Sequence, residues 1–194
     1  MDLKNLRSNL MGNAVRIIGG DLRGRVLHFP DLDGLRPTPD RVRETLFNWL
    51  GQRLDGLVCL DLFSGSSALA FEAVSRGAAR VDSVDVNSKA CASIRENCRK
   101  TEVVNIAVTC SEATDFLRQN RQLFDVVFLD PPFAQNGLIE DVLAVLTKHL
   151  SNGCRIYLES ADDIEIPQDF KSLRVAKAGR VHFALWEFQR QDAK

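Results

Sequence analysis

A regular alternation of short apolar runs with amphipathic segments begins at Val58 and continues to the end of the chain. Runs rich in β-branched and aromatic residues predict strands at 58–62, 81–86, 106–110, 125–130 and 154–159. Between them, helical periodicity predicts helices at 67–76, 88–100, 112–120 and 138–149. Each helix is long enough to make a right-handed crossover between parallel strands. The alternation therefore predicts a doubly wound α/β fold around a mostly parallel sheet.

The two ends of the chain depart from this pattern. Strand-like runs at 173–178 and 181–188 flank Gly179-Arg180, which predicts an antiparallel hairpin at the C-terminal edge of a seven-stranded sheet. Runs at 15–18 and 25–29 flank several glycines and predict a small N-terminal β-hairpin. We expect residues 1–53 to form an extension and residues 54–194 to form the main domain.

A helix is expected after the N-terminal hairpin. Thr38-Pro39 is typical of a helix start, with proline in the first turn, and the helix is expected to run from Pro39 to Gly51. Four apolar residues of this segment share one side, namely Val42, Leu46, Phe47 and Leu50.

Composition limits the classes of function. The hydrophobic content of 45% is typical of a soluble domain, and no apolar run approaches the roughly 20 residues of a membrane span, so we expect a cytoplasmic protein without a membrane role. Residues 1–53 hold nine Lys and Arg against six Asp and Glu, although the whole chain has a net charge of −1. A nucleic-acid partner would therefore bind the N-terminal quarter.

Cysteine and histidine spacing gives no sign of a metal site. The five cysteines include no CxxC pair, and the three histidines stand alone. We interpret all eight as ordinary structural residues, with the cysteines reduced.

The first expected strand runs into a turn of small residues, Asp61-Leu-Phe-Ser-Gly-Ser-Ser. Small residues at the carboxyl end of a strand let main-chain amides approach a bound ligand. Gly65 is the only glycine between Gly56 and Gly77, so the GxGxxG pattern of dinucleotide-binding enzymes is absent. A nucleotide-like ligand is expected, and hydride chemistry is not.

Two acidic residues follow the next two strands. Asp85 stands where a carboxylate can accept hydrogen bonds from ribose hydroxyls, although it could also be a solvated acid before a helix. Glu112 could accept from an adenine amino group, or could merely favour the start of a helix through the helix dipole.

The sequence Asp130-Pro-Pro-Phe ends the fourth expected strand. Two prolines lack amide donors and fix the backbone, so the carboxylate and neighbouring carbonyls would form an array of acceptors suited to an amino group. Phe133 would stack on a base. The alternative is a proline-rich loop, but the expected strand order places Asp130 at the same cleft as Gly65, which favours the amine site.

These motifs resemble those of class I S-adenosylmethionine methyltransferases that act on exocyclic amines. Three further segments, Arg16-Ile-Ile-Gly-Gly, Leu35-Arg-Pro-Thr-Pro-Asp-Arg-Val-Arg-Glu and Ala68-Leu-Ala-Phe-Glu-Ala, are similar to the bacterial RsmD family. That family methylates N2 of a guanine in 16S ribosomal RNA. The resemblance extends from about Val15 to Phe188 and implies a Rossmann-like fold.

Carried over by position, the resemblance implies two sets of site residues. Cofactor contacts would come from Thr38, Asp61, Phe63, Gly65, Ser66, Ser67, Asp85, Val86, Glu112 and Ala113. The amine site would consist of Asp130, Pro131, Pro132 and Phe133. Ser67 replaces a glycine that is usual in the family, so it would cap the following helix or donate to the cofactor carboxylate; Glu112 stands where Asn or Asp is commoner.

An RNA footprint is expected on the extension. It would consist of Arg16, Arg23, Arg25, Arg36, Arg41 and Arg43. Nearby aspartates offset much of this charge, so composition alone would also fit a solvated face, and the resemblance favours RNA. The expected partner is ribosomal RNA within a 30S subunit or assembly intermediate, bound by a monomer.

Two other functions fit parts of the sequence. An N6-adenine DNA methyltransferase uses the same acceptor chemistry, but 194 residues leave no room for a separate target-recognition domain. A non-catalytic RNA-binding module on the same fold finds support only in Ser67.

Overall fold

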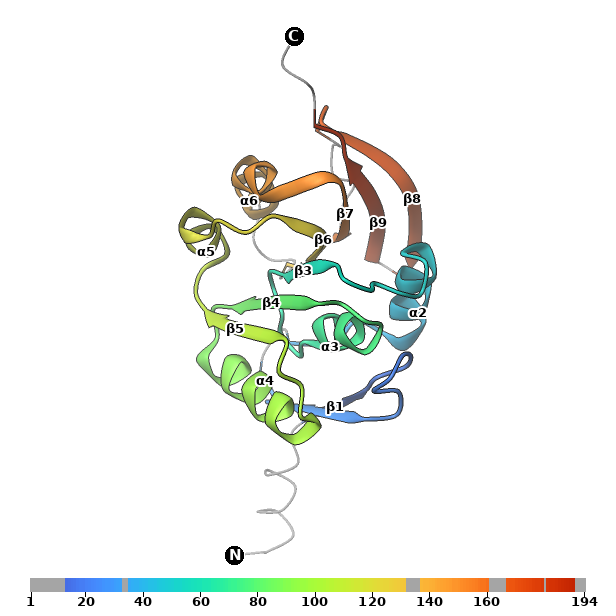
Figure 1. The fold of residues 1–194 in the computed structure, drawn as a ribbon, viewed down its shortest axis with the longest axis vertical. Coiled ribbons are helices and arrows are strands. Elements are labelled where there is room, and N and C mark those ends of the chain that lie inside the picture. Colours follow the sequence, from blue (N-terminus) through green and yellow to red (C-terminus); the bar gives the residue numbers. More distant parts are fainter. Residues whose placement is uncertain (1–12, 33–34, 132–136, 161–166, 180, 191–194) are drawn as a thin grey trace, which may run out of the picture.

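The computed structural model describes residues 13–32, 35–131, 137–160, 167–179 and 181–190. Its centre is a seven-stranded sheet with the order β5-β4-β3-β6-β7-β9-β8 (Figure 1). The strands are β3 (Val58–Asp61), β4 (Arg80–Asp85), β5 (Ile106–Cys110), β6 (Phe124–Leu129), β7 (Leu150–Ser160), β8 (Phe170–Ala178) and β9 (Val181–Phe188). The first five are parallel, whereas β9 lies antiparallel between β7 and β8. The expected fold is confirmed.

Helices cover both faces of the sheet. They are α3 (Ala68–Ser75), α4 (Ser88–Thr101), α5 (Ala113–Gln119) and α6 (Leu138–Leu146), the last followed by a short 3₁₀ turn at Thr147–His149. Helices α3 and α4 pack into one hydrophobic cluster, and α5 and α6 pack into a second cluster on the other face. The chain reverses its direction of winding between β3 and β6, which are adjacent. Ligands of such sheets bind at this switch point, beyond the carboxyl ends of the strands.

The N-terminal segment, which is the described part of the extension expected at residues 1–53, belongs to the same packing unit as the sheet. Strands β1 (Asn13–Arg16) and β2 (Val26–Phe29) form the expected hairpin, which lies beside α4 (Figure 1). The Asn97 side chain on α4 accepts from the amide of His28 and donates to its carbonyl. Helix α2 (Asp40–Trp49) follows, and its Trp49 ring stacks on Phe183 of β9 with centroids 5.3 Å apart. The division at residue 53 therefore stays a proposal about function, since both parts share one core cluster.

Several boundaries differ from the expected ones. Strand β7 begins at Leu150 and β8 at Phe170, each earlier than the apolar pattern indicates, because Leu150 pairs with Phe124 and the polar Lys171 pairs with Glu187. The sixth helix ends at Leu146 and not at His149. Among the described residues, no helix combines the length and apolar character needed to span a bilayer.

Candidate active site

Four acidic residues meet at the carboxyl edge of the sheet. Asp61 ends β3, Asp85 ends β4, Asp130 directly follows β6, and Glu159 is the penultimate residue of β7. Because neighbouring parallel strands end at the same edge, these carboxyls gather at the switch point without any unusual loop geometry.

Asp61 has a buried acceptor atom without a donor among the described residues. Its side chain is buried, and its Oδ2 atom has no hydrogen-bond partner among the described residues. Burial raises the pKa of Asp61 to about 7; a backbone hydrogen bond from Ala70 opposes the rise, and the charge of Asp85 adds to it. A buried acceptor without a donor costs about 1–3 kcal/mol. The site is therefore suited to a ligand that brings a donor, above all a cationic one.

Asp85 holds two loops together. Its Oδ2 atom accepts from the amide of Gly65 at 2.7 Å, and its Oδ1 atom accepts from the amide of Asn87, also at 2.7 Å. A carboxylate oxygen has a second lone pair, so each can still accept from a hydroxyl group. Asp85 is thus more than a solvated acid before a helix, and it remains available to a ribose.

Ser67 does not cap α3 with its side chain, although capping was one of the two roles expected of it. The residue occupies the N-cap position of α3 with φ of +60°, makes no side-chain capping bond, and is fully buried. Its hydroxyl lies 3.2 Å from the Ser83 hydroxyl, inside the sheet–helix interface. Capping by Ser67 was therefore a wrong expectation, and in this position its hydroxyl faces the protein interior. The positive φ explains why glycine is usual there.

Asp130 accepts a hydrogen bond from the N-terminal segment. The Thr38 hydroxyl donates to its Oδ2 atom at 3.3 Å. Burial raises the pKa of Asp130 well above its usual range, and the charges of Glu159 and Asp61 raise it further. Thr38 lies just before the Pro39 N-cap of α2, which has no side-chain cap, so the Thr38 side chain bonds to Asp130 and does not cap the helix. Pro131 is buried beside Asp130, whereas the predicted Pro132 and Phe133 lie outside the described residues.

The structure adds two residues that sequence reasoning missed. Glu159 is only 4% exposed, and the hydroxyl of the buried Tyr157 donates to its Oε1 atom at 2.6 Å. The available signal was an acid that directly follows three buried residues of β7, namely Ile156, Tyr157 and Leu158.

The site is more exposed where the adenosine part of the cofactor is expected than it is around Asp61 and Asp130. Glu112 occupies the N-cap position of α5 without making a capping bond, and its side chain is exposed. Val86 is 62% exposed, although it is apolar and directly follows Asp85. Ala113 is buried, and Phe63 is half-buried. An exposed valine here offers an apolar surface to a planar group.

One of the six predicted RNA contacts is wrong. Arg43 is fully buried: Nη1 lies 2.6 Å from Oε1 of Glu72, and Nε donates to the Thr38 carbonyl at 3.1 Å. Phosphate cannot reach such a guanidinium. The other five arginines are exposed, namely Arg16, Arg23, Arg25, Arg36 and Arg41.

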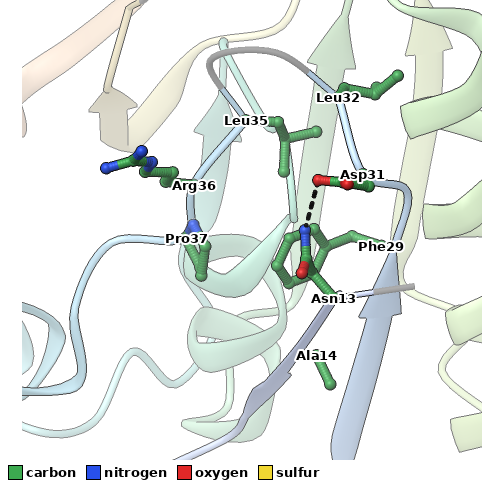
Figure 2. Close-up of a pocket in the computed structure, with 8 residues that line it drawn as sticks. All are labelled: Asn13, Ala14, Phe29, Asp31, Leu32, Leu35, Arg36 and Pro37. Atoms are coloured by element: carbon green, nitrogen blue, oxygen red, sulfur yellow. Dashed lines mark hydrogen bonds between the residues drawn. The ribbon is translucent and has the colours of Figure 1, made fainter. Parts of the chain in front are cut away.

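A cavity of about 440 Å³ lies within the N-terminal segment (Figure 2). It is lined by Asn13, Ala14, Phe29, Asp31, Leu32, Leu35, Arg36 and Pro37. The Asn13 side chain donates to Asp31 across it at 3.1 Å. Leu35 also lies near the cofactor loop, since a Cβ atom on Gly65 would be 3.7 Å from its Cγ. The N-terminal segment thus adjoins the predicted cofactor turn as well as Asp130.

Comparisons with known proteins agree with this geometry. Residues 15–187 match the family model described as Conserved hypothetical protein 95. The chain belongs to this family, the RsmD family of methyltransferases. An RsmD relative, "Ribosomal RNA small subunit methyltransferase D" of Escherichia coli K12, is 39% identical over 91% of both chains. The Haemophilus influenzae protein of the same name is 36% identical over 95% of this chain and 100% of its own.

Solved structures of other proteins have the same fold as this RsmD family member. A structure from Escherichia coli has a TM-score of 0.84 at 38% identity and covers 92% of this chain and 100% of its own. A more distant rRNA methylase from Streptococcus thermophilus has a TM-score of 0.64 at 13% identity, covering 79% of this chain and 100% of its own. The second likeness concerns the fold alone.

Proposed function

We propose that this chain transfers a methyl group from S-adenosylmethionine to the exocyclic N2 amine of a guanine in small-subunit ribosomal RNA. The observation that carries the proposal is the position of Asp130, a carboxyl followed by a buried proline at the end of β6, beside the strand that leads into the Gly65 loop. Family membership and the names of the RsmD relatives support the RNA substrate.

The residues present fit the proposed cofactor. The unpartnered Oδ2 atom of Asp61 would accept from the ammonium group of the methionine part. Gly65 leaves room for close approach of the backbone, and Asp85 keeps lone pairs for the ribose hydroxyls. When bound, S-adenosylmethionine supplies an activated methyl group on a sulfonium centre.

The chain's own part in the reaction is to prepare the amine. A base amine is a weak nucleophile because its lone pair is delocalised into the ring. Asp130 and the Pro131 carbonyl would accept its hydrogens, which orients the lone pair and stabilises the developing positive charge. As the new N2–C bond forms, the bond between the methyl group and the sulfonium sulfur would break, its electron pair staying on sulfur as a neutral thioether, and Asp130 would take the proton that the nitrogen releases. The base must be unpaired to enter, and Phe133 remains the predicted stacking partner.

Five exposed arginines of the N-terminal segment would contact phosphates. The segment reaches the amine site through Thr38, so an RNA held by these arginines would be delivered to Asp130. We propose a 30S subunit or assembly intermediate as the partner of a monomeric enzyme that needs no metal.

The proposal is tested by methyl transfer from labelled S-adenosylmethionine to undermethylated 30S subunits, protein-free 16S RNA and duplex DNA. Nucleoside mass spectrometry then identifies the product. We expect N2-methylguanosine from an RNA substrate. N6-methyladenine from DNA would establish the adenine-specific alternative, and cofactor binding without any product would favour the non-catalytic module. Asp130→Ala should lose transfer while its calorimetric cofactor affinity stays within about twofold of wild type, because its role is confined to the amine.

A further inference from the structure

The register of β6 and β7 places Glu159 beside Asp130, the proposed amine acceptor. Leu129 of β6 pairs with Leu158 of the parallel strand β7, so the next residue on each strand is Asp130 and Glu159 respectively. Glu159 is 4% exposed, and Tyr157 holds its Oε1 atom at 2.6 Å. Two carboxyls therefore emerge side by side from the centre of the sheet.

Among the described residues, neither carboxyl takes part in an ion pair, and the Arg43 guanidinium, which donates to the Thr38 carbonyl, is paired with Glu72 and Asp40. The neighbouring strand β3 contributes another acid, Asp61, whose charge further raises the pKa of Asp130. On β9, Phe183 pairs with Glu159, and His182 pairs with the following residue, Ser160. Tyr157 is a neutral donor, because burial keeps its pKa far above the usual range. Two adjacent buried carboxylates without a cation repel each other, so one of them retains a proton.

Thr38 lies at the two carboxyls. Its hydroxyl donates to Oδ2 of Asp130 at 3.3 Å. Burial raises the pKa of Glu159, and the Tyr157 and Thr38 hydroxyls oppose this rise. A hydroxyl group has one hydrogen and can donate to only one acceptor at a time. The Thr38 hydrogen that Asp130 holds therefore cannot serve Glu159, and one proton held between the two acids relieves their repulsion.

We propose that Glu159 is a positioning residue for Asp130, and that the two adjacent side chains share one proton. Glu159 thereby determines over which pH range Asp130 is the carboxylate that an amine requires. The proposal rests on the amine role of Asp130 proposed above, but the shared proton itself can be measured without any substrate.

The experiment is a pH titration of Asp130 by carboxyl-carbon NMR in the full chain without ligand. Glu159→Gln keeps an acceptor for Tyr157 and removes the charge, so the Asp130 midpoint should fall by about one pH unit or more. Thr38→Val removes a donor to the carboxylate, so the midpoint should rise. Shifts in opposite directions distinguish this role from a general loss of packing. Glu187→Gln is the matched control, since Glu187 lies on β9 and pairs with Arg155; it should leave the midpoint unchanged.

The same variants are then assayed for methyl transfer across pH 5 to 9. The acidic limb of kcat/KM should move to lower pH in Glu159→Gln and to higher pH in Thr38→Val. The proposal is overturned if the Asp130 midpoint does not move in Glu159→Gln, and a rate that falls uniformly across pH would not rescue it. If the midpoints shift as expected and the wild type methylates no nucleic acid, the shared proton stands and the proposed function fails.

Discussion

Arg43 and Glu72 form an ion pair that is completely closed to solvent, with Nη1 and Oε1 2.6 Å apart. The Arg43 guanidinium also donates to the carbonyls of Arg16 and Thr38, and Glu72 pairs in addition with Arg76. The hairpin, the segment that bears Thr38, and helix α3 are thus joined at a single side chain. The position of Thr38 against Asp130 depends on this junction.

Replacing Arg43 with methionine should therefore destabilise the fold strongly. Loss of one partner of a buried pair costs about 3–5 kcal/mol, because the remaining charge has no compensation. Arg76 still pairs with Glu72, so we expect the lower end of that range. Urea unfolding measures the change. Arg41→Met, an exposed site on the same helix, should change stability by less than about 0.5 kcal/mol. Equal stability of the two variants would contradict the structural role of Arg43.

The hairpin turn offers a second test through two glycines. Gly20 and Gly24 both have positive φ, at 72° and 87°. A Cβ atom on Gly20 would lie 1.8 Å from the Ser75 carbonyl oxygen, whereas a Cβ atom on Gly24 would meet nothing within 4 Å. Gly24→Ala should thus cost only the backbone strain, about 1 kcal/mol.

Gly20→Ala should cost at least about 2 kcal/mol more than Gly24→Ala, because it must also break the bond from the Asp21 amide to the Ser75 carbonyl. Thermal unfolding of the two variants compares them directly. Similar melting temperatures would show that the hairpin does not require close contact with α3.

Ser67 tests whether the departure from the usual glycine matters for cofactor binding. Its side chain is buried against Ser83 and its φ of +60° is unfavourable for serine. Ser67→Gly relieves about 1 kcal/mol of strain and loses a hydrogen bond of similar size, so stability should change little. Calorimetry should show S-adenosylmethionine affinity within about twofold of wild type. A tenfold loss would mean that the hydroxyl turns to the cofactor when it binds.

Local patterns were sufficient for the succession of strands and helices and for the location of Asp61, Asp85 and Asp130 at the carboxyl ends of their strands, because each of these acids is the last residue of a strand or directly follows one. Glu159 was missed because its importance comes from the pairing of β7 with β6, which residues 150–160 do not specify by themselves. The error at Arg43 was avoidable, since that residue lies four positions before the buried Phe47 and shares its helix face.

Asp61 gives a pH-dependent prediction whose sign follows from burial. Its pKa is about 7 in the folded chain and lies near 3.8 when exposed. A carboxyl with a raised folded pKa contributes stability that is present at low pH and is lost as the pH rises through 7. Asp61→Asn removes this dependence. The melting temperature of Asp61→Asn relative to wild type should therefore increase from pH 5 to pH 8, corresponding to at most about 3 kcal/mol, because the loss ends once the pH exceeds the folded pKa.

Scanning calorimetry of both proteins at pH 5, 6.5 and 8 measures the difference, and subtraction removes the titration of other groups. Asp115→Asn, at an exposed helical acid paired with Arg118, is the matched control for the substitution itself. Saturating S-adenosylmethionine should stabilise the wild type more at pH 8 than at pH 5, because its ammonium group would pair with the ionised Asp61. A difference between Asp61→Asn and wild type that stays constant with pH would show that Asp61 is already ionised, and compensated, in the free protein.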